Sequence, residues 1–78
     1  MPYKKELVDE INVLALFDTS NNQEGLKVHS SASADSIEAT ARLHEKGLIT
    51  QKDGGYLTDL GVDAAEHVQS LLSILNAN

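Results

Sequence analysis

The sequence predicts a small α+β domain that is mostly helical, in the order helix, short edge strand, helix, β-hairpin and C-terminal helix. Apolar residues recur at helical spacing in three segments, capping residues stand at the segment ends, and an Asp-Gly pair separates two β-rich runs. The chain has 78 residues, fewer than the about 100 to 150 of a common domain. We therefore expect one domain, residues 1–78.

The first helix is expected from about Lys4 to Phe17. At about 100° per residue, one apolar arc collects Leu7, Val8, Ile11, Leu14 and Ala15. Val13, Leu16 and Phe17 point to the other side and make the last turn apolar almost all round, so this end must be covered on two sides. Either the rest of the domain or a second subunit covers it. We expect a homodimer interface formed by Val13, Leu16 and Phe17, with Ile74 contributing.

The segment that follows is polar and contains two weak structural signals. Ser20 to Gln23 matches a Ser-x-x-Gln capping box, which predicts one short helical turn. Leu26 to His29 alternates in polarity and predicts an edge strand of a small sheet. The serine-rich run from Ser30 to Ser33 is expected to be a loop.

A second helix is expected over residues 34–46, with Ser33 or Asp35 as N-cap and Gly47 as the C′ residue. Its predicted buried arc consists of Ile37, Thr40, Ala41, Leu43 and His44. Its predicted outer arc consists of Asp35, Glu38, Arg42, Glu45 and Lys46. Because Arg42 is spaced three or four residues from Glu38 and Glu45, the outer arc is expected to neutralise its own charges.

The hairpin is the clearest local signal. Asp53 and the glycines after it separate two β-rich runs, and either Gly54 or Gly55 closes the turn. Thr58 then caps a final helix over about residues 59–75. Its apolar stripe consists of Gly61, Ala64, Ala65, Val68, Leu71, Leu72 and Leu75. We expect packing within the domain to cover this stripe and to leave only a modest partner surface.

Composition narrows the possible roles. The net charge of −6 and the pI near 4.7 weigh against nucleic acid and anionic membranes as partners. The sequence has no signal-peptide pattern and no apolar run of membrane-spanning length, so we expect a soluble, cytoplasmic protein. Without Cys, neither disulfides nor thiolate zinc sites are available, and oligomerisation is the remaining way for so short a chain to add buried area.

The sequence offers no catalytic or metal-binding pattern. It lacks Cys, a Gly-x-Ser-x-Gly motif and a Gly-rich phosphate loop. His29, His44 and His67 have no metal-ligand spacing, and His44 is expected to be a hydrogen-bonded packing residue, with a pH-sensitive interface role as the alternative. We therefore expect no enzyme activity, no metal and no cofactor.

Two segments resemble parts of winged-helix regulators of the MarR and PadR types. Residues 43–49 resemble the end of the recognition helix running into the wing, and residues 53–61 resemble the wing turn and the Leu-Thr-x-x-Gly start of the last helix. The whole chain more closely resembles a family of short bacterial proteins of unknown function. The resemblance implies a winged-helix-like fold. The chain departs from the regulators in residues 27–34, which lack the helical apolar period of the helix before the recognition helix.

Two functions follow from these observations. The first is a non-enzymatic regulatory or protein-interaction module with a degenerate winged-helix fold, whose protein partner the sequence does not identify. The alternative is a DNA-binding transcriptional regulator, which the acidic leading residues of the second helix disfavour. In either case the candidate partner face consists of Lys27, Glu38, Arg42, Lys46, Lys52 and Tyr56.

Overall fold

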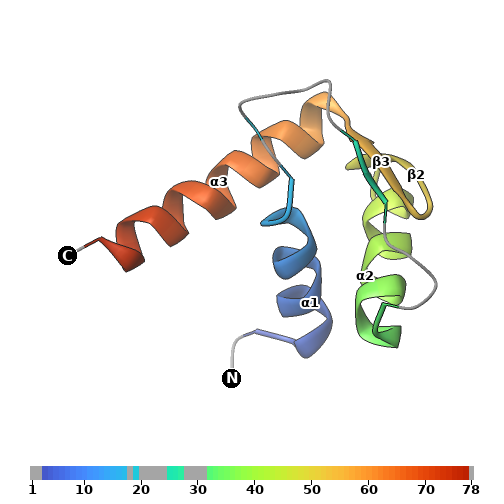
Figure 1. The fold of residues 1–78 in the computed structure, drawn as a ribbon, viewed down its shortest axis with the longest axis horizontal. Coiled ribbons are helices and arrows are strands. Elements are labelled where there is room, and N and C mark those ends of the chain that lie inside the picture. The colour runs from blue at the N-terminus through green and yellow to red at the C-terminus, as the bar shows by residue number, and fades with distance from the viewer. Residues whose placement is uncertain (1–2, 18, 20–24, 28–31, 78) are drawn as a thin grey trace.

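Helices and short strands alternate along the chain in a computed structural model, which describes residues 3–17, 19, 25–27 and 32–77 (Figure 1). The elements are α1 (Lys5–Leu14), β1 (Leu26–Lys27), α2 (Ala34–Glu45), β2 (Ile49–Gln51), β3 (Gly54–Leu57) and α3 (Asp59–Asn76). This order confirms the prediction of a mostly helical α+β fold with a winged-helix-like arrangement. The predicted helical turn at residues 20–23 and most of the predicted serine loop lie outside the described residues.

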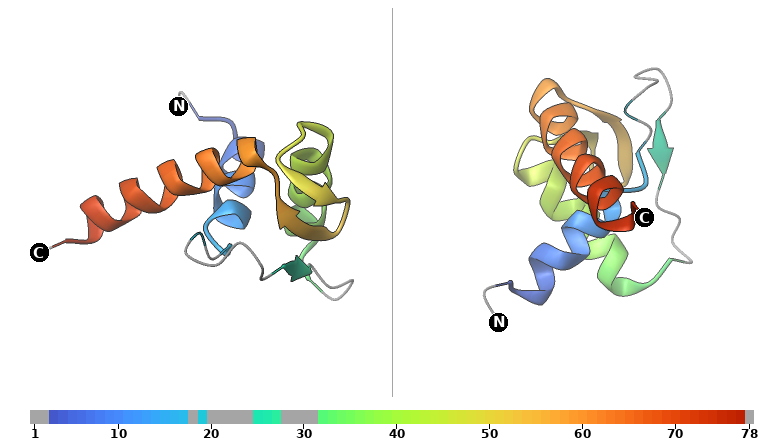
Figure 2. Two further views of the ribbon diagram at one scale, coloured as in Figure 1. Left: turned by 90° about the horizontal axis from the view of Figure 1, so that it is seen from above. Right: turned by 90° about the vertical axis from the view of Figure 1, so that its left-hand side faces the viewer.

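α2 and the sheet lie together at one end of the molecule, and α3 extends toward the other (Figures 1 and 2). α1 packs mainly against α2, and the hairpin formed by β2 and β3 lies beside α2 (Figure 1). β1 pairs with β3 in antiparallel fashion, so the strand order is β1-β3-β2 and β1 lies at an edge. The predicted edge strand is confirmed at Leu26 and Lys27, whereas His29 lies outside the described residues.

Local capping chemistry fixes where the helices begin and end. Ser33 is the N-cap of α2, and its hydroxyl accepts from the Ser36 N–H at 3.2 Å. Thr58 caps α3 in the same way, as predicted, and accepts from the Gly61 N–H at 3.1 Å. Gly47 follows α2 with a φ of 81°, the left-handed conformation expected of a C′ glycine.

Neither of the two glycines that were expected to close the hairpin lies in its turn. Lys52 and Asp53 form the turn, and Gly54 and Gly55 both lie in β3 with φ angles of 134° and 77°. The pairing of Gln51 with Gly54 is out of step with that of Ile49 with Leu57, so the hairpin contains an irregularity. Both glycines are therefore required by the backbone.

The core lies where the end of α1 meets α2, the hairpin and the first half of α3. Its buried apolar residues are Val13, Leu14, Phe17, Ala39, Leu43, Ile49 and Ala65. Val13 and Phe17 are only 2% and 5% exposed within a single chain. The prediction that these two residues form a dimer interface is therefore wrong, because the domain itself covers this side of α1.

The helices also turn different arcs inward from those predicted. α1 buries Glu10 with Val13 and Leu14, whereas most of its predicted apolar arc remains exposed. α2 buries Ala39 beside Leu43, and the predicted core residues Ile37 and His44 are exposed. Small side chains at the α1–α2 contact explain the second difference, because Ala39 lets the two helices approach closely.

α3 packs on the rest of the fold only as far as Gln69. Gly61 and Ala65 are buried, Ala64 and Val68 lie against the core, and Gln69 contacts Phe17. Beyond Gln69 the helix extends away from α1, α2 and the hairpin, as Figures 1 and 2 show. The prediction that intramolecular packing covers the whole apolar stripe is therefore wrong for its distal part, because no described element reaches that far.

Candidate interaction surface

The four residues predicted to form a dimer interface do not form one surface. Val13 and Phe17 belong to the core, whereas Leu16 and Ile74 are among the most exposed large apolar residues. The end of α1 is tied to α3 by Gln69, whose amide donates to the carbonyl oxygen of Phe17. This contact joins the segment that follows α1 to α3.

The predicted partner face on α2 and the hairpin is only partly available. Glu38 and Lys52 are exposed, and Tyr56 presents about half of its surface. Arg42 and Lys46 instead turn toward α1. The side chain of the sixth predicted residue, Lys27, lies outside the described part of the structure.

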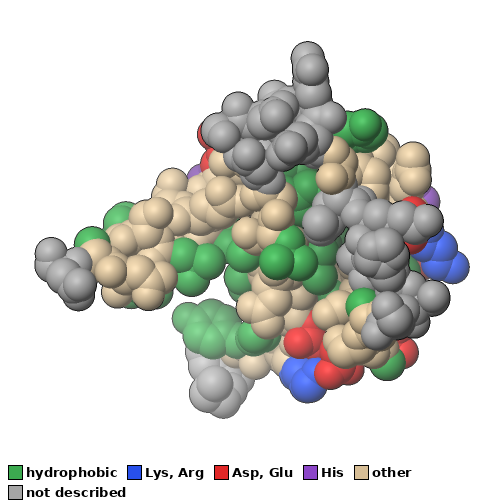
Figure 3. Space-filling model, viewed as in Figure 1, with side chains coloured by type: hydrophobic (Ala, Val, Ile, Leu, Met, Phe, Trp, Pro, Cys, Tyr) green, Lys and Arg blue, Asp and Glu red, His purple; other side chains and the backbone are tan. Residues whose placement is uncertain are grey.

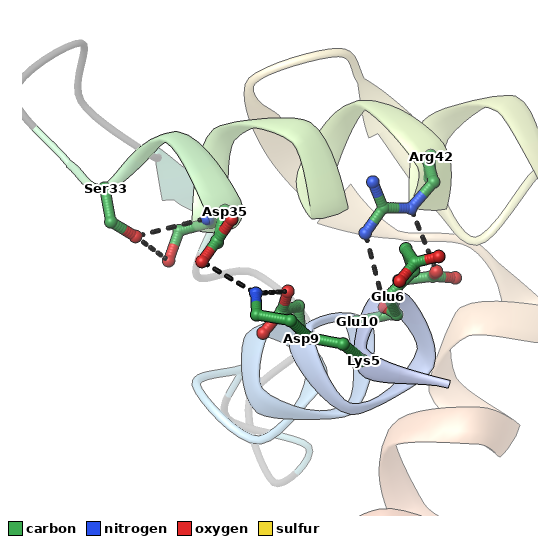
Figure 4. A network of polar contacts seen from close by, with 8 residues as sticks. Lys5, Glu6, Asp9, Glu10, Ser33, Asp35 and Arg42 are labelled. Atoms are coloured by element: carbon green, nitrogen blue, oxygen red, sulfur yellow. Dashed lines mark hydrogen bonds and ion pairs between the residues drawn. The ribbon is translucent and has the colours of Figure 1, made fainter. Parts of the chain in front are cut away.

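A buried carboxylate of α1 holds both of these cations. Arg42 Nε donates to Glu10 Oε2 at 3.1 Å (Figure 4). Lys46 Nζ contacts the other oxygen of the same carboxylate. Arg42 also donates to the carbonyl oxygen of Glu6 at 3.2 Å. Only 6% of the Glu10 side chain is exposed. Arg42 and Lys46 therefore join α2 to α1, and their charges are paired within the chain.

This arrangement differs from the predicted self-neutralisation of α2. Among the described residues, Arg42 pairs with Glu10 of α1 and with neither Glu38 nor Glu45. Sequence reasoning missed Glu10 altogether. A signal for it was present, since Glu10, Val13 and Phe17 recur at spacings of three and four residues, as one face of a helix requires.

A second, exposed group of charges joins the N-terminal ends of α1 and α2. Lys5 Nζ donates to Asp35 Oδ2 at 2.7 Å and to Asp9 Oδ2 at 2.9 Å (Figure 4). The hydrogen bond to Asp35, followed by the one to Asp9, raises the pKa of Lys5 above its usual range. Lys5 is thus a third cation that is paired with carboxylates of its own chain.

These pairs leave little positive charge for a nucleic-acid partner. The chain has six Lys and Arg residues, and three of them are engaged in the contacts above. The outward side of α2 presents Glu38 and Glu45, and its first turn carries Asp35, which pairs with Lys5 of α1. DNA-binding helices present cations to phosphates and donors to base edges, and the described surface of α2 does not have this character.

An uncovered apolar surface spans two helices. Large aliphatic side chains are exposed on α1 and on the distal part of α3. In the space-filling view, hydrophobic side chains lie on both sides of an open notch beside α3 (Figure 3). Each is between 40% and 69% exposed. We call this surface the α1–α3 face, and its residues are Leu7, Val8, Ile11, Leu71, Leu72 and Leu75.

The distal part of α3 is also uncharged. Residues 68–78 contain no Asp, Glu, Lys, Arg or His. A helix end that projects from the fold normally carries charged side chains toward water. An exposed apolar surface that spans more than one element instead indicates a site of protein or membrane interaction.

A smaller hollow lies between α2 and the hairpin turn. It has a volume of about 250 Å³ and is lined by Ile37, Thr40, Ala41, Lys52 and Asp53. Ligand pockets commonly measure about 300 to 1,000 Å³ and contain several convergent polar groups. This hollow is smaller, and we assign no chemistry to it.

Groups of metal ligands and membrane-spanning helices are both absent from residues 3–17, 19, 25–27 and 32–77. Within these residues, no group of three His, Cys, Asp or Glu side chains is placed to hold a metal ion. No described helix combines the length and apolar character needed to cross a bilayer. His67 donates from Nδ1 to the Asp63 carbonyl oxygen at 2.6 Å, a contact within one turn of α3.

Comparison with known proteins places the chain in a family. Searches of curated proteins and of solved structures return no match. The resemblance to MarR- and PadR-type regulators and the bacterial origin therefore stay predictions. A family model described as "Family of unknown function (DUF5669)" matches residues 1–76. The match extends over nearly all of the chain, which therefore belongs to the DUF5669 family.

Proposed function

We propose that this protein is a small non-enzymatic regulatory or protein-interaction module, and that the α1–α3 face is its binding surface. The observation that carries the proposal is the uncovered, uncharged distal half of α3 beside the exposed apolar residues of α1. Burial of apolar surface is the main driving force of protein association. A cytoplasmic location and a homodimeric state are parts of the same proposal.

A non-catalytic role is supported by the chemistry available to the chain. The sequence contains no Cys and no nucleophile motif, and the described histidines are separated from one another. Enzymes need a nucleophile or an acid–base pair held in a concave site. The α1–α3 face instead offers aliphatic side chains, which serve binding.

The DNA-binding alternative rests on the winged-helix-like order of elements. In that case α2 would enter the major groove and the hairpin would contact the backbone. The pairing of Arg42 and Lys46 with Glu10 argues against this role. A DNA-binding protein with so few free cations would bind duplex DNA measurably only at low salt. A titration with mixed-sequence duplex DNA at low salt therefore distinguishes the two functions.

Photo-crosslinking in cells tests the proposed surface. A photoreactive phenylalanine analogue at Ile74, which borders the α1–α3 face, should form an adduct with a protein. The same analogue at Glu38, on the outward side of α2, is the matched control and should form none. Protein adducts absent from position 74, or nucleic-acid adducts at position 38, would contradict the proposal.

A further inference from the structure

We infer that the occupant of the α1–α3 face is a second copy of this chain, with the distal half of each α3 lying in the notch of its partner. This inference rests on the proposed function and names the partner. It places the dimer contact on Leu7, Val8, Ile11, Leu71, Leu72 and Leu75. The sequence-based interface around Val13 and Phe17 is not used.

The shape of the chain supports a reciprocal contact. The distal half of α3 is a projecting apolar helix, and the notch beside it is bordered by α1 and by α3 itself (Figures 1 and 3). One chain thus carries both the inserted part and the part that receives it. A two-fold axis lets both insertions occur at once, which closes the assembly at two subunits.

Charge also indicates where two copies can meet. Each chain carries a net charge of −6, so two copies repel one another over most of their surfaces. Residues 68–78 are free of charge. The side chains of this stretch can be buried between two copies without removing a charged side chain of α3 from water.

The size of the core gives the third argument. The described residues bury seven apolar side chains, a small core for a chain of this length. A standard interface covers about 800 Å² per subunit, or about one seventh of the 5479 Å² that the chain exposes. Dimerisation through a face that spans two helices would extend the core along α3.

Sedimentation equilibrium with matched variants tests the inference. The native chain should have about twice its monomer mass of 8.4 kDa from low to hundreds of micromolar. Leu71→Glu should raise the dimer dissociation constant by about 100-fold, because the charge would be buried twice in a symmetric contact. Leu60→Glu is the control, since Leu60 and Leu71 lie on the same helix and are 57% and 56% exposed.

Because Leu71 is exposed in the monomer, its replacement should leave the fold intact, which the far-ultraviolet circular dichroism spectrum would show. Leu16→Glu tests the interface expected from the sequence and should leave the dimer unchanged. A dimer that Leu16→Glu dissociates and Leu71→Glu does not would overturn the inference.

Disulfide trapping gives a second test that does not depend on weakening the dimer. The chain has no Cys, so single-cysteine variants can be mixed. An Ile11→Cys chain and a Leu72→Cys chain should become linked under mild oxidation. A Glu38→Cys chain mixed with Leu72→Cys is the control and should link far less. Equal linking in both mixtures would contradict the proposed contact.

The two proposals fail in different ways. A native chain that stays monomeric at hundreds of micromolar removes the second copy as the occupant. If the photoreactive group at Ile74 then captures a different protein, the proposed interaction function stands and only the identity of the partner is wrong. If it captures no protein, both proposals fall.

Discussion

Single residues decide which charges remain available to a partner. Glu10 is almost completely buried, and Arg42 and Lys46 satisfy its two carboxylate oxygens from the neighbouring helix. A buried charge without partners is strongly unfavourable, so these cations are held in place. The contact that joins α1 to α2 also removes the two cations that an anionic ligand of α2 would need.

Removing the Arg42 cation should destabilise the fold more than neutralising the Glu10 carboxylate. We expect Arg42→Met to lower the free energy of unfolding by about 2 to 3 kcal/mol, because it leaves a buried carboxylate with one partner. Glu10→Gln should cost less, about 1 to 2 kcal/mol, since Arg42 and Lys46 remain 29% and 48% exposed and water can solvate them. Urea unfolding measures both, and equal losses would contradict the arrangement.

Lys5 should show a pH dependence of known sign. Its pKa is raised in the folded state by Asp35 and then by Asp9. Its contribution to stability is therefore fully present below the ordinary lysine pKa and is lost only as the pH rises through the higher folded value. Observation of the Lys5 side chain by NMR should show a lower pKa in Asp35→Asn than in the native chain. An unchanged value would show that the pair is not formed in solution.

The elements differ in how far local sequence determines them. Ser33, Thr58 and Gly47 mark helix ends through chemistry that operates within a few residues, and all three predictions are confirmed. The arc that a helix buries depends on where distant segments lie. The α1 sequence has apolar residues on two arcs. The arc that is buried carries Glu10, whose carboxylate pairs with Arg42 and Lys46 from the α2 side.

The junction between the hairpin and α3 should be intolerant of added volume. A Cβ at Gly61 would lie 1.9 Å from the Leu48 carbonyl oxygen. Gly→Ala stabilises an ordinary helix position by about 1 kcal/mol, but Gly61→Ala should instead lower the free energy of unfolding by about 3 kcal/mol.

Gly47→Ala is the comparison for this variant. Gly47 has a φ of 81° with no atom within 4 Å of an added Cβ, so its replacement should cost only about 1 to 2 kcal/mol of backbone strain. Thermal unfolding of the two variants compares them. A Gly61→Ala protein that is as stable as the native chain would contradict the packing of α3 on Leu48.

At the scale of the whole molecule, the excess of apolar surface was predictable from the sequence but its place was not. The spacing of apolar residues predicts more apolar surface than one small domain covers, and it predicts that this surface lies at the end of α1. The fold encloses Val13 and Phe17 and instead leaves the distal half of α3 uncovered. The reason is geometric, since the C-terminal part of the 18-residue helix α3 extends past α1, α2 and the hairpin (Figure 1).

Hydrogen exchange at protein concentrations below and above the dimer dissociation constant tests the central claim most directly. An uncovered helix end opens easily and exchanges its amides quickly, whereas a helix buried in an interface is protected. We predict that protection of the amides of residues 71–76 rises with protein concentration, while that of the amides of α2 stays constant. Protection of residues 71–76 that is the same at low and at high concentration would contradict self-association through the α1–α3 face.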